Sequence, residues 1–154
     1  MKEEFPEELA KQIAAQEISV APTLVMMEAF AQSGRNGYRP EHYENAAKAV
    51  NLLDKCGVRI LAATDANSGS FAPAVGFGPT LHREMELLVE AGMAPTDVLS
   101  AATGHTAEAF EVDDFGVIKA GNRADLLLVD GRPDQHITDI SKIRQFWIGG
   151  KTLR

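Results

Sequence analysis

The chain has 154 residues and a formal net charge of −7 at pH 7, with 45% hydrophobic and 24% charged residues. This length suits about one globular domain, and the acidic balance argues against a nucleic-acid-binding protein, which needs clustered Lys and Arg. Because Cys56 is the only cysteine, neither an intrachain disulfide nor a Cys-based zinc cluster can form.

The N-terminal stretch predicts neither export nor membrane insertion. It reads MKEEFPEELAKQ, which is acidic and lacks the apolar core of a signal peptide. No segment approaches the roughly 18 consecutive apolar residues that a membrane helix needs. We therefore expect a soluble, cytoplasmic protein.

The first part of the chain predicts helices alternating with strands. The first helix carries Leu9, Ile13 and Ala14 on one side, and Pro22 stops the first strand. This alternation is typical of parallel strands joined by right-handed crossovers. The predicted elements are a helix at 6–16, a strand at 18–24, a turn-rich stretch closing residues 25–40, a helix at 41–56 and a strand at 58–63.

A single carboxylate, Asp65, follows the strand at 58–63. The strand is almost entirely apolar, as expected for a strand buried on both faces. After Asp65 come fifteen residues rich in Gly, Ser, Pro and Ala. In a parallel α/β barrel such a position lies on the catalytic face, where the βα loops gather. A carboxylate that merely caps a turn is the alternative interpretation, and residue spacing alone does not decide between the two.

The second part changes character near residue 111. Helical patterns occupy residues 81–91, a stretch from Pro95, and residues 106–110. Short apolar runs and frequent turns then predict β-structure at 117–118, 124–129 and 143–148, with Gly149-Gly150 as a hairpin turn leading to 151–153. We therefore predict two parts, residues 1–110 and 111–154.

Several stretches together resemble the C-terminal part of the metal-dependent amidohydrolase superfamily. They are ATDA, LHREMELLVEAGMAPTDVLSAATGHTAEAF, GVIKAGNRADLLLVDGRP and the closing WIGGKTLR, and VAPTLVMM resembles the strand before the Asp strand. The resemblance is to imidazolonepropionase-like and dipeptidase-like branches, from about Glu17 onward.

This resemblance implies the last two βα units of a (β/α)₈ TIM-type barrel, followed by a small β-rich flanking segment. Residues 18–24 would be barrel strand seven and residues 58–64 strand eight. Such enzymes use one or two divalent metal ions, zinc being the expected one, to hydrolyse amides and related C–N bonds. Asp65 matches the family's metal-binding and proton-transferring aspartate. The family's HxH pair and its other ligands are absent from this sequence.

The remaining polar candidates have weaker support. His82, Asn67 and Ser68 are candidate substrate-binding residues, together with Ser70, because they lie in or just after the loop that follows Asp65. Small polar residues are also simply common in loops, and His82 also suits polar packing at a helix start. His42 and His136 are expected at the surface, and His105 beside a helix end.

Three hypotheses for the function follow. The chain is a fragment of an amidohydrolase that is inactive alone and holds no metal by itself. Alternatively, it is half of a split enzyme, completed by an N-terminal barrel half to act on a small molecule. A non-enzymatic oligomerising or binding module is the third. Because open strand edges favour pairing, we expect self-association or a partner.

Overall fold

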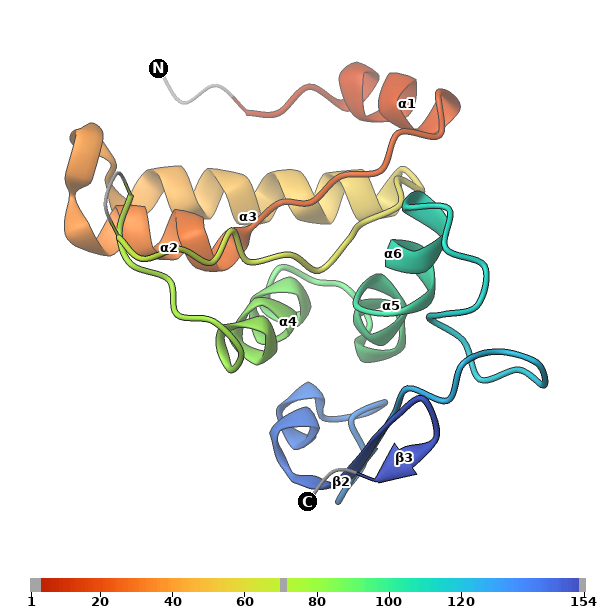
Figure 1. Cartoon of the computed structure of the whole chain (residues 1–154). Coiled ribbons are helices and arrows are strands. Elements are labelled where there is room, and N and C mark those ends of the chain that lie inside the picture. The colour runs from red at the N-terminus through yellow and green to blue at the C-terminus, as the bar shows by residue number, and fades with distance from the viewer. Residues whose placement is uncertain (1–3, 70–71, 153–154) are drawn as a thin grey trace.

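Two extended segments lie side by side between layers of helices (Figure 1). The computed structural model describes residues 4–69 and 72–152. Val20 and Ile60 form a parallel bridge: the Val20 N–H donates to the Arg59 carbonyl at 2.9 Å, and the Leu61 N–H donates to the Val20 carbonyl at 2.9 Å. Val20 thus bonds to Arg59 and Leu61, the two residues that flank Ile60, and this is the hydrogen-bond pattern of parallel strands. The two predicted strands therefore run in the expected direction, but their pairing is limited to this bridge.

Helices dominate the rest of the chain, and a small sheet closes it. The elements are α1 (Glu7–Ala15), α2 (Leu24–Ser33), the 3₁₀ turn η1 (Arg35–Gly37), α3 (Pro40–Lys55), α4 (Thr80–Glu90), α5 (Pro95–Ala101), α6 (Gly104–Ala109), β1 (Leu126–Val129), the 3₁₀ turn η2 (Ile137–Ser141), β2 (Ile143–Ile148) and β3 (Lys151–Thr152).

The predicted helices α1, α3 and α4 form where amphipathic patterns meet clear start and stop signals. Pro40 begins α3, a position where its missing N–H costs nothing. Gly57 follows that helix with φ 78°, a left-handed conformation that costs glycine little. In α1 the buried side chain is Ala10, while Leu9 is 41% exposed, so the buried face is rotated from the predicted one.

The helix α2 was not predicted; it precedes the turn-rich end of the stretch 25–40. Its sequence, LVMMEAFAQS, is apolar on most sides, so it lacks the polar stripe that reveals a surface helix. The predicted turn lies at η1 and the residues on either side of it.

Arg83 connects α4 to α2. Its Nη2 lies 2.9 Å from Glu28 of α2, and its Nη1 lies 3.2 Å from Glu86 and 2.8 Å from Glu90 of α4.

The hydrophobic core lies between these helices and the two extended segments. Leu24, Leu87, Leu88 and Val98 are fully buried, and Ile60 of the second extended segment is nearly so. η2 packs against α4 and contributes a buried isoleucine to the same core. None of the described helices is long and apolar enough to cross a bilayer.

The C-terminal sheet has the order β1-β2-β3, all antiparallel. Leu126 of β1 faces Trp147 of β2. Gly149 and Gly150 have φ values of 57° and 75°, as a two-residue hairpin turn with positive φ at both positions requires. This confirms the predicted hairpin as far as Thr152; Leu153 lies outside the described residues.

The predicted strand at 117–118 is wrong. Residues 117–118 belong to no strand of the structure, and the Ile118 side chain is 92% exposed. A β-branched pair without a neighbouring strand has no partner for its backbone groups, so local preference alone does not form a strand here.

Candidate functional site

Asp65 lies where the second extended segment ends. Its side chain is exposed, and its backbone has φ 51°, a left-handed conformation that is uncommon outside glycine but tolerated by Asp and Asn. The preceding Thr64 is half-buried, and its Oγ1 accepts a hydrogen bond from the Ala66 N–H at 3.2 Å. The chain thus turns sharply at Asp65 and presents its carboxylate to solvent.

The neighbouring extended segment ends in a similar turn. Thr23 has φ 48° and directly precedes α2. Since Val20 lies level with Ile60 in the parallel pair, Thr23 corresponds in register to Ala63, two residues before Asp65. Two non-glycine residues with left-handed backbones therefore follow the carboxyl ends of adjacent segments, and such conformations cluster at functional sites.

Asn67 organises the loop that follows Asp65. Its Nδ2 donates to the Asp65 carbonyl at 3.0 Å, its Oδ1 accepts from the Gly69 N–H at 2.7 Å, and its backbone N–H donates to the Val75 carbonyl at 2.9 Å. Both polar ends of this side chain are thus used within the loop, as is typical of Asn in turns.

The other predicted substrate-binding residues frame the same loop. Ser68 is exposed beside Asn67, and Ser70 lies outside the described residues. His82 is half-buried in the first turn of α4, and its backbone N–H donates to the Pro79 carbonyl at 3.0 Å. Asp65, Asn67 and Ser68 therefore share one loop, with His82 at its far end; their roles toward a substrate stay a prediction.

The described residues alone do not fit a catalytic metal ion. Among them, no three His, Cys, Asp or Glu side chains come together in a way that could hold one. A catalytic zinc site needs about three protein ligands besides water. Asp65 is a single donor, so additional ligands would have to come from outside the described residues.

The other histidines are placed in three different settings. His42 accepts a hydrogen bond from the Arg39 N–H through Nδ1 at 3.0 Å and so caps the start of α3. His136 is exposed, as predicted. His105 of α6 has a buried Nδ1 with no hydrogen-bond partner among the described residues.

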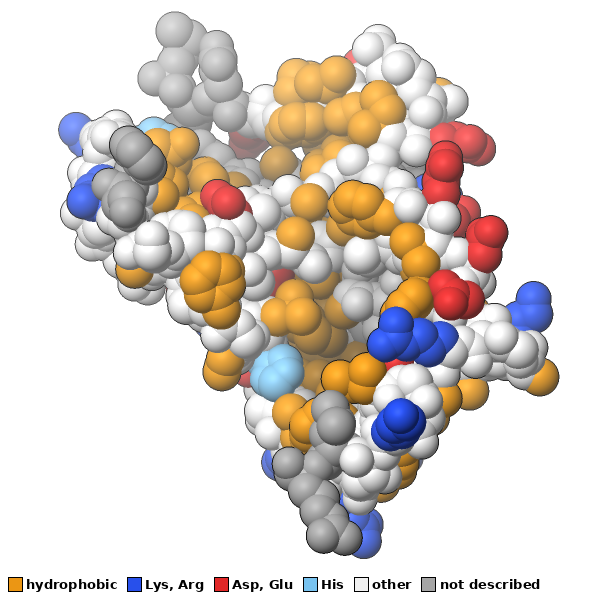
Figure 2. All heavy atoms as spheres, in the orientation of Figure 1, with side chains coloured by type: hydrophobic (Ala, Val, Ile, Leu, Met, Phe, Trp, Pro, Cys, Tyr) orange, Lys and Arg blue, Asp and Glu red, His pale blue; other side chains and the backbone are white. Residues whose placement is uncertain are grey.

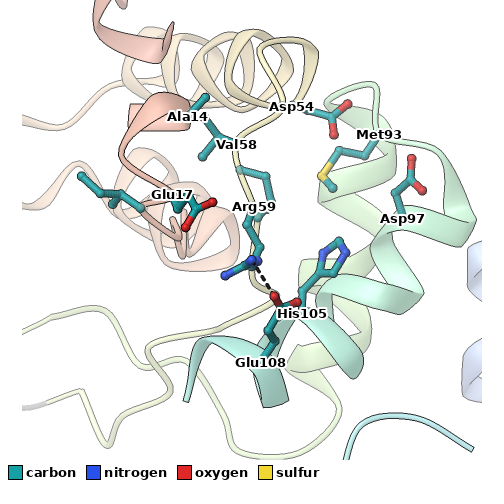
Figure 3. A pocket seen from close by; sticks show the side chains of 12 residues that line it. Ala14, Glu17, Asp54, Val58, Arg59, Met93, Asp97, His105 and Glu108 are labelled. Carbon is teal, nitrogen blue, oxygen red and sulfur yellow. Dashed lines mark hydrogen bonds and ion pairs between the residues drawn. The ribbon is translucent and has the colours of Figure 1, made fainter. Parts of the chain in front are cut away.

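A cavity of about 500 Å³ lies at the amino ends of the extended segments (Figure 3). It surrounds the start of the second segment and is lined by both acidic and basic side chains. Arg59 forms an ion pair with Glu108 at 2.8 Å across the cavity. Burial and the charge of Asp97 raise the pKa of Asp54, another lining residue.

The surface of the molecule is acidic along one edge. Figure 2 shows acidic side chains gathered there, on the side of α6 and the end of α1.

This cavity is not the candidate catalytic site. In parallel α/β folds, ligands bind beyond the carboxyl ends of the strands, and the cavity lies at their amino ends. Asp65 is not among its lining residues.

A residue that sequence reasoning missed is Glu84 of α4. Its side chain is fully buried, and its two carboxylate oxygens accept the Leu24 N–H at 3.0 Å and the Val25 N–H at 2.7 Å. Burial raises its pKa to about 7, against the opposing effect of these hydrogen bonds. The available signal was its spacing, three residues after Leu81 and four before Leu88, which places it on the buried face.

Comparison with known proteins identifies the family. The sequence profile described as "Amidohydrolase family" matches residues 9–153. The chain belongs to the amidohydrolase family. It is 37% identical over 91 residues to an imidazolonepropionase of Salinispora arenicola (strain CNS-205), an alignment that covers 58% of this chain and 21% of that protein.

Solved amidohydrolase structures share the fold. A crystal structure of an amidohydrolase has a TM-score of 0.78 and 25% identity, covering 97% of this chain and 37% of that one. A Xaa-Pro dipeptidase with methionine bound in its active site has a TM-score of 0.76 and 24% identity, covering 95% of this chain and 37% of that one. This chain therefore corresponds to little more than a third of each of these two structures.

These findings confirm the resemblance seen in the sequence. The chain is an amidohydrolase superfamily member with an α/β fold and dipeptidase-like relatives. The family is generally metal-dependent.

Proposed function

We propose that this chain is the C-terminal part of a hydrolase that cleaves C–N bonds in non-peptide or dipeptide-like amides, and that it is inactive alone. The observation that carries this proposal is the position of Asp65, exposed at the carboxyl end of a buried segment in an amidohydrolase chain. On this interpretation the paired segments around Val20 and Ile60 are the last two strands of a (β/α)₈ barrel.

The proposed role of Asp65 is to supply one of several metal ligands on the catalytic face, with zinc as the expected ion. The other ligands would come from the preceding barrel strands. Asn67 would hold the Asp65 loop in place, and His82 and Ser68 would face a small-molecule substrate.

The test measures zinc content and hydrolysis by the purified chain. After incubation with zinc chloride and dialysis, we expect well under one zinc ion per chain by elemental analysis. We also expect no cleavage of methionyl-proline above the buffer rate, because one carboxylate cannot hold a hydrolytic ion. Asp65→Asn serves as the matched control and should behave like the original chain. One tightly held zinc per chain, with cleavage that Asp65→Asn abolishes, would refute the proposal of an inactive part.

A second candidate function is half of a split enzyme, and the exposed C-terminal sheet favours it. Leu126, Leu127 and Leu128 of β1 are all more than one-third exposed. Consecutive strand residues point to opposite faces, so neither face of β1 is fully covered. An N-terminal barrel half would cover it in the split enzyme, and a second copy of this chain would cover it in a non-enzymatic oligomer.

Light scattering tests this uncovered sheet. We expect a dimer or larger assembly of the purified chain, because exposed apolar strands associate. The double substitution Leu126→Gln and Leu128→Gln should shift the assembly toward monomer, whereas Leu9→Gln, an exposed leucine on α1, should not. A monodisperse monomer of the unmodified chain would argue against self-association, and co-purification of a second protein would then indicate the split enzyme.

A further inference from the structure

The start of α2 is capped by a residue from a distant part of the chain. Thr23, at the N-cap position, makes no side-chain capping bond and has a left-handed backbone instead of the usual extended one. The first two N–H groups of the helix, from Leu24 and Val25, are buried and donate to Glu84, sixty residues later. One carboxylate therefore satisfies two backbone donors that no local residue satisfies.

This contact joins the turn after the first extended segment to the helix that follows the Asp65 loop. Glu84 belongs to α4, the helix that follows the Asp65 loop, and it binds the turn that follows the neighbouring segment. In register, that turn lies beside the residues just before Asp65. Both turns leave the same hydrogen-bonded point, since the segments pair at Val20 and Ile60, and the Thr23 turn and the Asp65 turn follow three and five residues later.

We propose that Glu84 is a positioning residue of the Asp65 site, which fixes the Thr23 turn and thereby sets the backbone conformation at Asp65. The hydrogen bonds between Glu84 and the start of α2 do not depend on the proposed function. A role of Glu84 in catalysis, through Asp65, rests on that function. A fully buried carboxylate bonded only to backbone N–H groups is suited to this role, because its two oxygens fix both the position and the orientation of the helix start.

The surroundings of Glu84 allow its ionisation to be followed. Burial is the main cause of the raised pKa of Glu84, and Glu28 of α2 adds a smaller contribution. Burial also raises the pKa of Tyr43 on α3, with a small contribution from Glu84. The nearby Arg83 is engaged with Glu28. Two other elements that pack on α4 carry acidic groups with partners of their own. Asp139 of η2 forms an ion pair with Lys142. Asp97 of α5 lies near Asp54 and, after burial, is the next cause of its raised pKa. The titration of the capped amides should therefore report mainly on Glu84.

The experiment uses nuclear magnetic resonance of the isotope-labelled full chain. The Leu24 and Val25 amide resonances should titrate together with a midpoint near pH 7, and the Thr64 and Asp65 amides should shift with the same midpoint. In Glu84→Gln this shared titration should vanish, and the two capped amides should exchange with solvent about tenfold faster. Glu86→Gln, on the same helix but bonded to Arg83, is the matched control and should keep the titration.

The outcomes separate this inference from the proposed function. If the capped amides titrate but Thr64 and Asp65 do not respond in the unmodified chain, Glu84 is only a helix cap and the inference is overturned; this result needs no variant to fold. If all four amides respond together and Glu84→Gln removes that response, Glu84 positions Asp65 even should the zinc and hydrolysis measurements contradict the proposed function.

Discussion

At the scale of single residues, Glu84 makes the stability of the protein depend on pH. Burial raises its pKa in the folded state to about 7, from an ordinary value of 4.5. The folded protein therefore binds a proton that the unfolded chain releases between these two pH values. Its contribution to stability is fully present below about pH 4.5, falls as the pH rises to about 7, and stays constant above that.

We therefore expect the free energy of unfolding to fall by about 3 kcal/mol across this window through Glu84, since each pKa unit corresponds to about 1.4 kcal/mol. Urea denaturation at several pH values between 4.5 and 8 measures the slope. Subtracting the same curve for Glu84→Gln isolates the contribution, because the other titrating groups are shared. Parallel curves for the two proteins would show that Glu84 keeps its ordinary pKa.

The two carboxylates also show what the sequence reveals at this scale. Asp65 was singled out because it closely follows the apolar run at 58–63 and precedes a long loop, both of which are local features; its catalytic role stays a prediction. The cap formed by Glu84 was not predictable, since its partners lie sixty residues earlier and bind through backbone atoms, which carry no residue-specific signal. The hydrogen bonds of Asn67 within its own loop depend on the turn geometry and were not predicted, and its role toward a substrate stays a prediction.

At the scale of secondary-structure elements, Arg83 connects α4 to α2. Its guanidinium contacts Glu28, Glu86 and Glu90, and these contacts hold its pKa well above the usual range. Removing the guanidinium leaves three acidic side chains close together, two of them half-buried. Networks of this kind stabilise more than an isolated surface pair does.

We expect Arg83→Ala to lower the free energy of unfolding by about 1–2 kcal/mol at low salt, and by less at high salt, where the repulsion among the acids is screened. Urea denaturation at the two ionic strengths measures both values. Lys11→Ala, which removes two exposed ion pairs within α1, is the control and should leave the unfolding midpoint nearly unchanged. Equal losses for the two variants would mean that Arg83 adds no coupling between α2 and α4.

Elements were predictable where their pattern was local. α1, α3 and α4 each combine an apolar stripe with Pro or Gly at their ends, and β2 with its glycine turn follows the same logic. α2 was not predicted for two reasons. It is apolar on nearly all sides, so no polar stripe marks it, and its first N–H groups are capped by the distant Glu84 instead of a neighbouring residue. The segments at 18–24 and 58–63 were predicted as strands, but one bridge is the extent of their pairing among the described residues. The next bond of the parallel ladder would need an N–H from residue 22, and Pro22 has none.

At the scale of the whole molecule, the chain corresponds to a minor part of its relatives. It covers 21% of the imidazolonepropionase and 37% of the amidohydrolase crystal structure. The predicted division near residue 111 stays a prediction. η2 packs against α4 and buries Ile137 in the main core, so the two predicted parts are in contact.

The pairing of Leu126 with Trp147 gives the protein a built-in optical reporter. Trp147 is the sole tryptophan in the sequence, and it lies in the central strand of the C-terminal sheet. Its fluorescence emission therefore reports the surroundings of that sheet, while the circular dichroism signal arises mostly from the helices. Recording both during one denaturation distinguishes loss of the sheet from loss of the helices without attaching a dye.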